Sequence, residues 1–193
     1  MSNYHFLAHI NRLRHIKRWS LMRNIEQESV SEHTYHMTLI LHMLCMIGKE
    51  IFNKNIPTEK LVLLALYHDV TEVFTGDLPT PIKHHNKQFL TEFAKIESIA
   101  AERLLEMVPP ELTKTFEFLI AKQEDTELKK WIKAADLLDA YLKCLTELTG
   151  GNREFSVAKE QIKRSLDKLN MPEVDYFLEH FTPGFEMTID EIS

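Results

Sequence analysis

The apolar residues of this 193-residue chain recur every three or four positions, in segments separated by nearly all of its prolines and glycines. Only 5 glycines and 7 prolines are present, which is about half the share of an average globular protein. This scarcity counts against a turn-rich β-sandwich, a collagen-like repeat or a disordered linker protein. We predict an all-α fold, a single compact helical bundle of about seven or more helices, in one domain that spans residues 1–193.

Seven segments carry the helical spacing. They cover residues 6–16, 37–47, 58–74, 89–104, 112–120, 131–148 and 157–169. In the third of them, Thr58 follows Pro57 as a predicted N-cap, and the helix is expected to continue to Phe74. The segment from Tyr176 to Ile192 is rich in aromatic and acidic residues, and its sequence leaves open whether it packs on the core or on a second subunit.

Charge and composition narrow the partners that the chain is expected to have. Lysine and arginine number 23 against 29 acids, a net charge of −6, which argues against sequence-independent binding to nucleic acid. The longest strictly apolar run is far shorter than the roughly 20 residues that span a bilayer. The cysteines, Cys45 and Cys144, form neither a disulfide framework nor a Cys-x-x-Cys zinc site. We therefore expect a cytoplasmic protein that binds neither a nucleic-acid polymer nor a membrane.

Two polar residues, His68 and Asp69, interrupt the end of the most apolar predicted helix. At about 100° per residue, His68 lies about 20° from Leu61, and Glu72 lies about 20° on its other side. Both therefore fall on the stripe that should face the core. A buried imidazole or carboxylate costs free energy unless it is paired or ligated. Asp69 lies on the flank of the stripe, where a single ion could contact it together with His68.

The preceding helix repeats this pattern at His33. This residue lies about 40° from Met37 on the apolar face, whereas His36 falls at the edge and His42 on the far side. With His68 and Asp69 it would offer two nitrogens and one oxygen. Such a set suits Mn²⁺, Fe²⁺, Co²⁺ or Zn²⁺ and suits Ca²⁺ poorly. The alternative is a helical domain that contains ordinary buried polar pairs.

A fourth ligand would come from the predicted helix over residues 131–148, which contains Asp136 and Asp139. Periodicity does not choose Asp136, and relative to Ala135 and Leu142 it slightly favours Asp139.

The order His33, His68-Asp69, Asp136 resembles the His…His-Asp…Asp signature of the HD-domain metal-dependent phosphohydrolases, an all-helical superfamily. Longer blocks resemble the bacterial YfbR-like 5′-deoxynucleotidase family. They are Arg-Trp-Ser-Leu-Met-Arg-Asn, Val-Ser-Glu-His, Tyr-His-Asp-Val-Thr-Glu-Val, Thr-Gly-Asp-Leu-Pro-Thr-Pro-Ile-Lys and Ala-Tyr-Leu-Lys-Cys-Leu. The likeness runs from about Phe6 to Ile192 and implies a single HD domain.

The resemblance implies one divalent transition metal per subunit, bound by four residues: His33, His68, Asp69 and Asp136. It chooses Asp136 over Asp139, which is left as a structural or solvated residue. Co²⁺ or Mn²⁺ is the expected ion, with Zn²⁺, Fe²⁺ or Cu²⁺ as alternatives.

The resemblance also implies hydrolysis of deoxyribonucleoside 5′-monophosphates to deoxynucleosides and phosphate by a homodimer. The implied substrate-binding residues are Arg18, Trp19, His33, Asp77, Leu78, Pro79 and Thr80, and the implied catalytic residues are Glu72, Arg18 and Asp69. The alternatives are another HD-type nucleotide phosphohydrolase, acting as a triphosphohydrolase or phosphodiesterase, and a non-catalytic metal-binding helical module.

Overall fold

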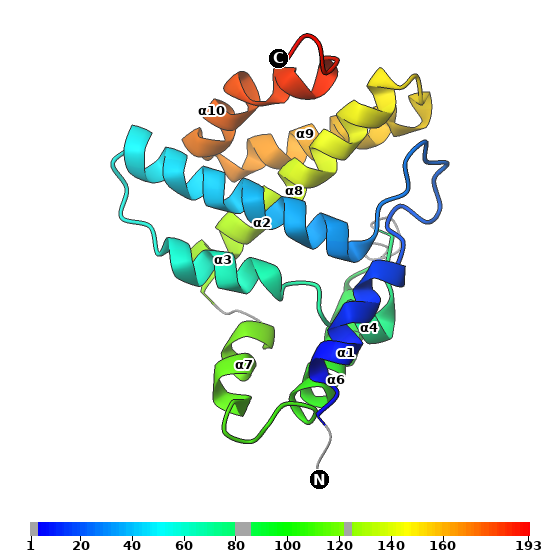
Figure 1. The fold of residues 1–193 in the computed structure, drawn as a ribbon, viewed down its shortest axis with the longest axis vertical. Helices are drawn as coiled ribbons and strands as arrows, with labels where there is room; N and C mark the ends of the chain where they lie inside the picture. Colours follow the sequence, from blue (N-terminus) through cyan, green and yellow to red (C-terminus); the bar gives the residue numbers. More distant parts are fainter. Residues whose placement is uncertain (1–3, 80–85, 122–124) are drawn as a thin grey trace. The chain divides into compact units, whose positions relative to one another are not determined.

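A computed structural model describes residues 4–79, 86–121 and 125–193 (Figure 1). The described part is all-α, as predicted: it forms no β-strand, and its single isolated β-bridge pairs Lys17 with Ser29. The α-helices are α1 (Phe6–Ile10), α2 (Val30–Met46), α3 (Thr58–Leu66), α4 (Glu72–Thr75), α6 (Lys87–Leu105), α7 (Thr113–Ile120), α8 (Thr126–Thr149), α9 (Ser156–Leu169) and α10 (Pro172–His180). Shorter helical turns are η1 (Asn11–His15), η2 (Ile47–Ile51), η3 (Arg153–Phe155) and η4 (Thr182–Glu186).

The backbone contacts group the chain into two compact units. The first contains the described residues of 1–21, 27–35 and 66–124, and the second contains those of 22–26, 36–65 and 125–193. Helix α2 begins in the first unit and ends in the second. The organisation of residues 1–193 as one domain stays a prediction.

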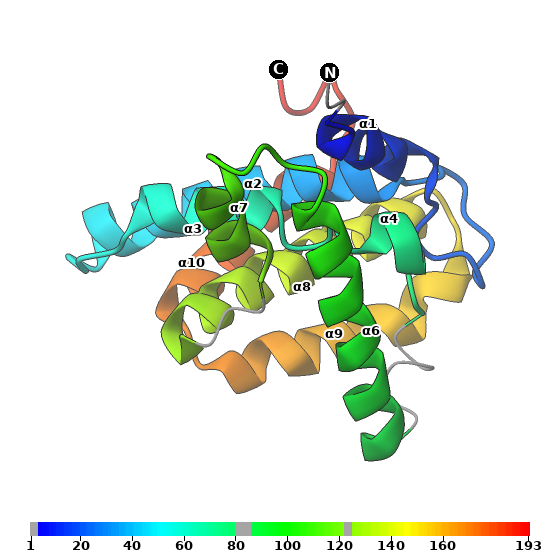
Figure 2. The ribbon, with the colours of Figure 1, turned by 90° about the horizontal axis from the view of Figure 1, so that it is seen from below.

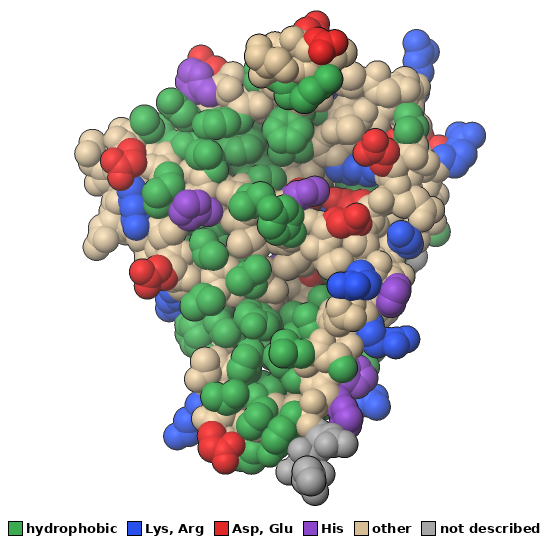
Figure 3. All heavy atoms as spheres, viewed as in Figure 1, with side chains coloured by type: hydrophobic (Ala, Val, Ile, Leu, Met, Phe, Trp, Pro, Cys, Tyr) green, Lys and Arg blue, Asp and Glu red, His purple; other side chains and the backbone are tan. Residues whose placement is uncertain are grey.

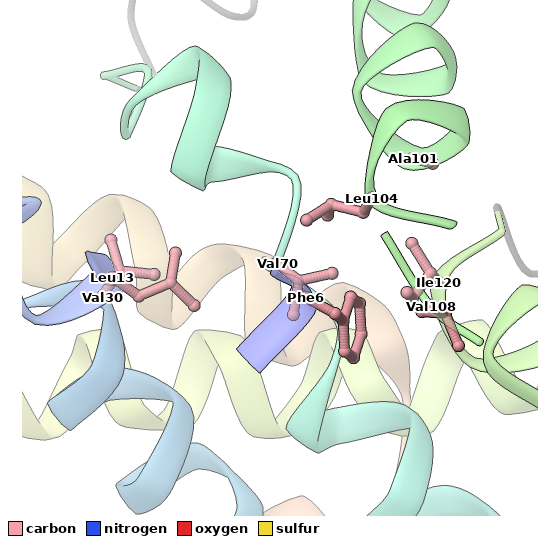
Figure 4. Close-up of a cluster of buried hydrophobic side chains, with 8 residues drawn as sticks. All are labelled: Phe6, Leu13, Val30, Val70, Ala101, Leu104, Val108 and Ile120. Atoms are coloured by element: carbon pink, nitrogen blue, oxygen red, sulfur yellow. The ribbon is translucent and has the colours of Figure 1, made fainter. Parts of the chain in front are cut away.

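The first unit is built around a cluster of buried apolar side chains (Figure 4). Its members are Phe6, Leu13, Val30, Val70, Ala101, Leu104, Val108 and Ile120. The ring of Phe6 meets that of Phe116 edge-on, with centroids 4.8 Å apart. The cluster joins α1, the first turn of α2, α6 and α7, so the segments that carry the site residues of this unit share one core.

The single helix predicted over residues 58–74 is wrong. Helix α3 ends at Leu66, and α4 begins only at Glu72. Between them, the backbone N–H groups of Val70 and Glu72 bond to carbonyls three residues earlier, not four. This tighter bonding is common where a helix ends. It buries Val70 in the first unit's core and leaves the His-Asp pair on a turn.

The two ends of the chain also depart from simple periodicity. The segment predicted as one helix over residues 6–16 continues beyond α1 as the 3₁₀ turn η1. At the other end, α10 and η4 cover much of the segment from Tyr176 to Ile192, for which the periodicity predicted no helix. Pro172 stands at the first position of α10, where its missing N–H removes no helical hydrogen bond.

In the second unit, α8 and α9 run side by side and are joined by a short turn (Figures 1 and 2). Helix α8 begins at an N-cap, Asp125, whose side chain accepts hydrogen bonds from the backbone N–H groups of Glu127 (3.0 Å) and Leu128 (3.2 Å). The largest fully buried apolar side chains of this unit are Met37, Leu41, Leu44, Leu61, Leu138, Leu145, Phe155 and Leu166.

Glu147, a buried acid of α8, holds the loop over residues 22–26 by hydrogen bonds. It accepts hydrogen bonds from the backbone N–H groups of Ile25 (2.9 Å) and Glu26 (3.2 Å) and from the amide of Asn152 (2.7 Å). Its fourth partner is the ammonium group of Lys143. Burial raises the pKa of Glu147, but these donors outweigh it and lower the pKa to about 2.

Hydrophobic side chains reach the surface on the face shown in Figure 3. The exposed large hydrophobic residues of α2 and α3 include Leu39, Met43 and Leu63. Within the described part of the chain, no helix has the length and apolar character needed to cross a membrane.

Candidate metal and substrate site

The first turn of α2 places His33. Ser29 and Glu32 cap each other: the backbone N–H of Ser29 donates to Oε2 of Glu32 at 2.7 Å, and the backbone N–H of Glu32 donates to Oγ of Ser29 at 3.3 Å. This reciprocal pair is a capping box, which satisfies donors that a helix start would otherwise leave unbonded. The backbone of His33 then bonds to the carbonyl of Ser29, and its side chain is fully buried, as the periodicity predicted.

The turn between α3 and α4 brings His68 and Asp69 to His33. The two Nε2 atoms of the histidines lie 3.3 Å apart. Oδ2 of Asp69 lies 3.0 Å from Nε2 of His68 and 3.5 Å from Nε2 of His33. Imidazole nitrogens that present lone pairs to one another need a proton or a cation between them. Two such nitrogens and a carboxylate oxygen form a donor set that fits a divalent transition metal.

The charge of Asp69 agrees with a ligand role. Burial raises the pKa of its carboxyl, but His68, His33 and Arg18 outweigh that effect and hold the pKa well below its ordinary value. Asp69 is therefore a carboxylate near neutral pH. A metal ligand must be deprotonated in this way.

Asp136 and Asp139 both lie on α8, in the second unit. Oδ2 of Asp136 accepts a hydrogen bond of 2.7 Å from Nζ of Lys133, within the same helix. Asp139 is buried, so it is not the solvated residue that was one expectation for it. The role of Asp136 as a ligand stays a prediction.

The predicted substrate residues Arg18 and Trp19 share a partner, Glu28. Nη1 of Arg18 lies 2.9 Å from Oε2 of Glu28, and the indole Nε1 of Trp19 donates to the same oxygen at 3.2 Å. Sequence reasoning missed Glu28. The available signal was its position among the first acids after a basic N-terminal segment.

The backbone at Trp19 is in an unusual conformation. Its φ is 56°, in the left-handed region that bulky side chains rarely adopt. Such a conformation costs on the order of 1–3 kcal/mol and persists only where the surroundings enforce it. Strained residues of this kind cluster at functional sites.

The segment after α4 contains the predicted substrate loop. Gly76 has a φ of 70°, which lets the chain turn away from α4. Burial raises the pKa of Asp77; Asp69 acts in the same direction, and Arg18 and a hydrogen bond from the backbone of Trp19 oppose it. The adjacent Leu78 and Pro79 are half-buried, and Thr80 lies outside the described residues.

Glu72 is the first residue of α4 and is partly buried. Its backbone N–H donates to the carbonyl of Asp69 at 3.0 Å, so one turn of chain links the two carboxyl groups. Helix α4 is in turn held against α6, because the guanidinium of Arg103 lies 4.8 Å from the ring centroid of Phe74. A partly buried carboxyl on a fixed turn beside a metal-type donor set could take up or release a proton.

Comparison with known proteins shows the family of the chain. The chain matches the family described as 5′-deoxynucleotidase YfbR-like over residues 5–185. A 5′-deoxynucleotidase of Enterobacter sp. (strain 638) is 46% identical over 194 residues, which cover 100% of this chain and 98% of that protein. The chain belongs to the YfbR-like family. The resemblance inferred from the sequence blocks is thereby confirmed.

Solved structures show the fold of this YfbR-like protein. An HD-domain phosphohydrolase from Listeria innocua superposes with a TM-score of 0.80 at 22% identity, covering 93% of this chain and 87% of its own. A cyanophage S-2L HD phosphohydrolase, described as bound to dA and one catalytic Zn²⁺ ion, superposes with a TM-score of 0.62 at 21% identity, covering 92% and 96%. The predicted HD-domain fold is confirmed.

Proposed function

We propose that this protein is a divalent-metal-dependent 5′-deoxynucleotidase, which hydrolyses deoxyribonucleoside 5′-monophosphates to deoxynucleosides and phosphate. The observation that carries the proposal is the convergence of His33, His68 and Asp69, with Arg18 near enough to lower the pKa of Asp69. Curated relatives that are nearly half identical to the chain are named 5′-deoxynucleotidases. A metal-type donor set beside a guanidinium is suited to an ester of phosphate.

The three convergent residues His33, His68 and Asp69 would hold the metal, one ion per subunit. Asp136 is proposed as the fourth ligand on the sequence resemblance. Co²⁺ or Mn²⁺ is the proposed ion, because two imidazoles and carboxylates suit either. When bound, such an ion lowers the pKa of a water molecule and stabilises charge on a phosphoryl group.

Arg18 is proposed to bind the phosphate, because a guanidinium offers a rigid fork of donors. Asp77 is proposed to accept a hydrogen bond from a sugar hydroxyl, and Trp19 to fill the space that a ribose 2′-hydroxyl would need. His33, Leu78, Pro79 and Thr80 complete the proposed substrate set. A hydrophobic wall rejects an added hydroxyl by about a hundredfold, so the preference for deoxyribose should be firm but incomplete.

Glu72 is proposed to exchange a proton with the attacking water or with the leaving 5′ oxygen. Its partial burial and its place one turn of chain after Asp69 support this role. Asp69 would act as an anionic ligand of the metal, and Arg18 would donate hydrogen bonds to the phosphoryl group.

The experiment that tests this function is product analysis with the metal-loaded protein. A deoxynucleoside 5′-monophosphate should yield a deoxynucleoside and orthophosphate in equal amounts. Pyrophosphate or tripolyphosphate from a deoxynucleoside triphosphate, or a linear product from a cyclic dinucleotide, without activity on the monophosphate, would assign a different HD-type activity. We further propose that the protein is a cytoplasmic homodimer. Light scattering would measure its molar mass and so test the dimer.

A further inference from the structure

Glu28 is an acid whose position the proposed chemistry does not explain. Its side chain is 11% exposed, and that of Arg18 is 12% exposed. A negative charge so close to a phosphate-binding guanidinium opposes the approach of an anionic substrate. The position of Glu28 beside Arg18 must therefore serve something other than attraction of the substrate.

The backbone sets Glu28 opposite Arg18. The N–H of Arg18 donates to the carbonyl of Glu28 at 3.0 Å, and the N–H of Val30 donates to the carbonyl of Ile16 at 3.0 Å. These bonds flank the β-bridge between Lys17 and Ser29. Residues 16–18 and 28–30 are thus paired along the backbone, and this pairing fixes the position of the Glu28 side chain.

One atom of Glu28 holds two residues at once. Its Oε2 accepts hydrogen bonds from the guanidinium of Arg18 at 2.9 Å and from the indole N–H of Trp19 at 3.2 Å. An indole has a single donor, so this bond fixes the orientation of the ring. A guanidinium has five donors in a fork, so it has the capacity to bind a carboxylate and a phosphate together.

The strained backbone of Trp19 needs such support. A left-handed φ of 56° at a bulky residue is maintained only by surrounding contacts. Such contacts include the bond from the indole to Glu28 and the bond from the Trp19 backbone to Asp77. A ring held in one orientation before the sugar arrives can discriminate against a hydroxyl more sharply than a mobile ring.

We propose that Glu28 is a positioning residue, which holds Arg18 and Trp19 in place for the phosphate and the sugar and so sharpens the preference for deoxyribose. The inference rests on the proposed function, because the substrate roles of Arg18 and Trp19 belong to it. Glu28 acts through these two side chains and need not contact the substrate.

Two variants remove the interaction from opposite sides. Glu28→Gln keeps the shape and an acceptor oxygen but removes the charge, and Trp19→Phe keeps a ring but removes the indole donor. Each should raise the KM for dAMP about tenfold, as expected for the loss of a hydrogen bond to a charged group. Each should also lower the ratio of activity on dAMP to that on AMP, and Glu28→Gln should change kcat by less than about twofold.

Glu154→Gln is the matched control. Glu154 also pairs with an arginine, Arg23, whose Nε lies 2.6 Å from Oε2. Arg23 is outside the proposed substrate set, so the same chemical change there should leave KM and the dAMP-to-AMP ratio at wild-type values. Metal content and thermal melting, measured on every variant, show whether the fold and the metal site are intact.

A readout independent of activity separates this inference from the proposed function. In a Trp131→Phe background, Trp19 is the sole tryptophan. Glu28→Gln should shift its emission to longer wavelength, because the indole then bonds to a neutral, weaker acceptor and the ring is held less firmly away from water. A wild-type protein without activity on dAMP would overturn the proposed function, while the emission would still test Glu28. An active protein whose Glu28→Gln variant keeps the wild-type KM, ratio and emission would overturn the positioning role.

Discussion

His33 and His68 are 35 positions apart in the chain, yet their Nε2 atoms lie 3.3 Å apart. His33 is fully buried on α2, and His68 lies on the turn after α3. The carboxylate of Asp69 is within 3.5 Å of both. Protein interiors hold such groups together only when they are paired or ligated, so this relationship is the basis of the metal site that we propose.

Asp69→Ala should abolish metal retention, because it removes an anionic ligand from the proposed donor set. Metal analysis after purification should find less than about a tenth of the wild-type content, in line with the loss of one of few ligands. Asp167→Ala, which removes an exposed acid of α9, is the control and should retain the metal. A normal metal content in Asp69→Ala would refute the assignment.

Glu72→Gln should lose turnover but keep the metal. The amide has nearly the same shape and cannot exchange a proton, so kcat should fall by roughly a hundredfold to ten-thousandfold. Steady-state kinetics and metal analysis on the same preparation provide the two measurements. Unchanged turnover would exclude Glu72 from proton transfer.

Trp19→Ala should relax the sugar preference by opening the space beside the 2′ position. The ratio of kcat/KM for dAMP to that for AMP should fall by up to about a hundredfold, the limit for steric rejection of a hydroxyl. Parallel phosphate-release assays on both nucleotides measure it. If the ratio stays at its wild-type value, the steric account of discrimination is wrong.

Acid should remove the stabilisation that Glu147 provides. Its pKa is lowered from 4.5 to about 2 in the folded protein, so the unfolded state binds the proton first as the pH falls. The contribution is complete above the unfolded pKa and is lost as the pH falls through the folded pKa. The gap in unfolding free energy between wild type and Glu147→Gln should therefore narrow between pH 4.5 and about 2.

Urea denaturation at several pH values measures this gap, with Asp167→Asn as an exposed acid-to-amide control. A gap that stays constant over the whole range would mean that the donors around Glu147 do not favour its ionised form.

Periodicity predicted the parts of the fold that depend on repeated burial. The stripe that includes Met37 placed His33 inward, and the helices over residues 131–148 and 157–169 lie within α8 and α9. The break between Leu66 and Glu72 was missed, because a local change from four-residue to three-residue hydrogen bonding leaves no periodic trace. The sequence pattern is informative where many residues share one face.

The contacts of two acids, Glu28 and Glu147, were missed for a different reason. Glu28 reaches Arg18 across a loop, and Glu147 reaches Ile25 from more than a hundred positions away. Such contacts depend on tertiary placement, and an acid that will be buried has the same local sequence as a solvated one. The assignment of Asp136 over Asp139 likewise came from the family resemblance.

The most direct test of the central claim is phosphate release from dAMP and AMP in parallel, with the protein first stripped by a chelator and then resupplied with Mn²⁺ or Co²⁺. The account predicts release from dAMP that returns only with the metal, and little release from AMP. No release from either nucleotide, or release that persists without metal, would contradict it.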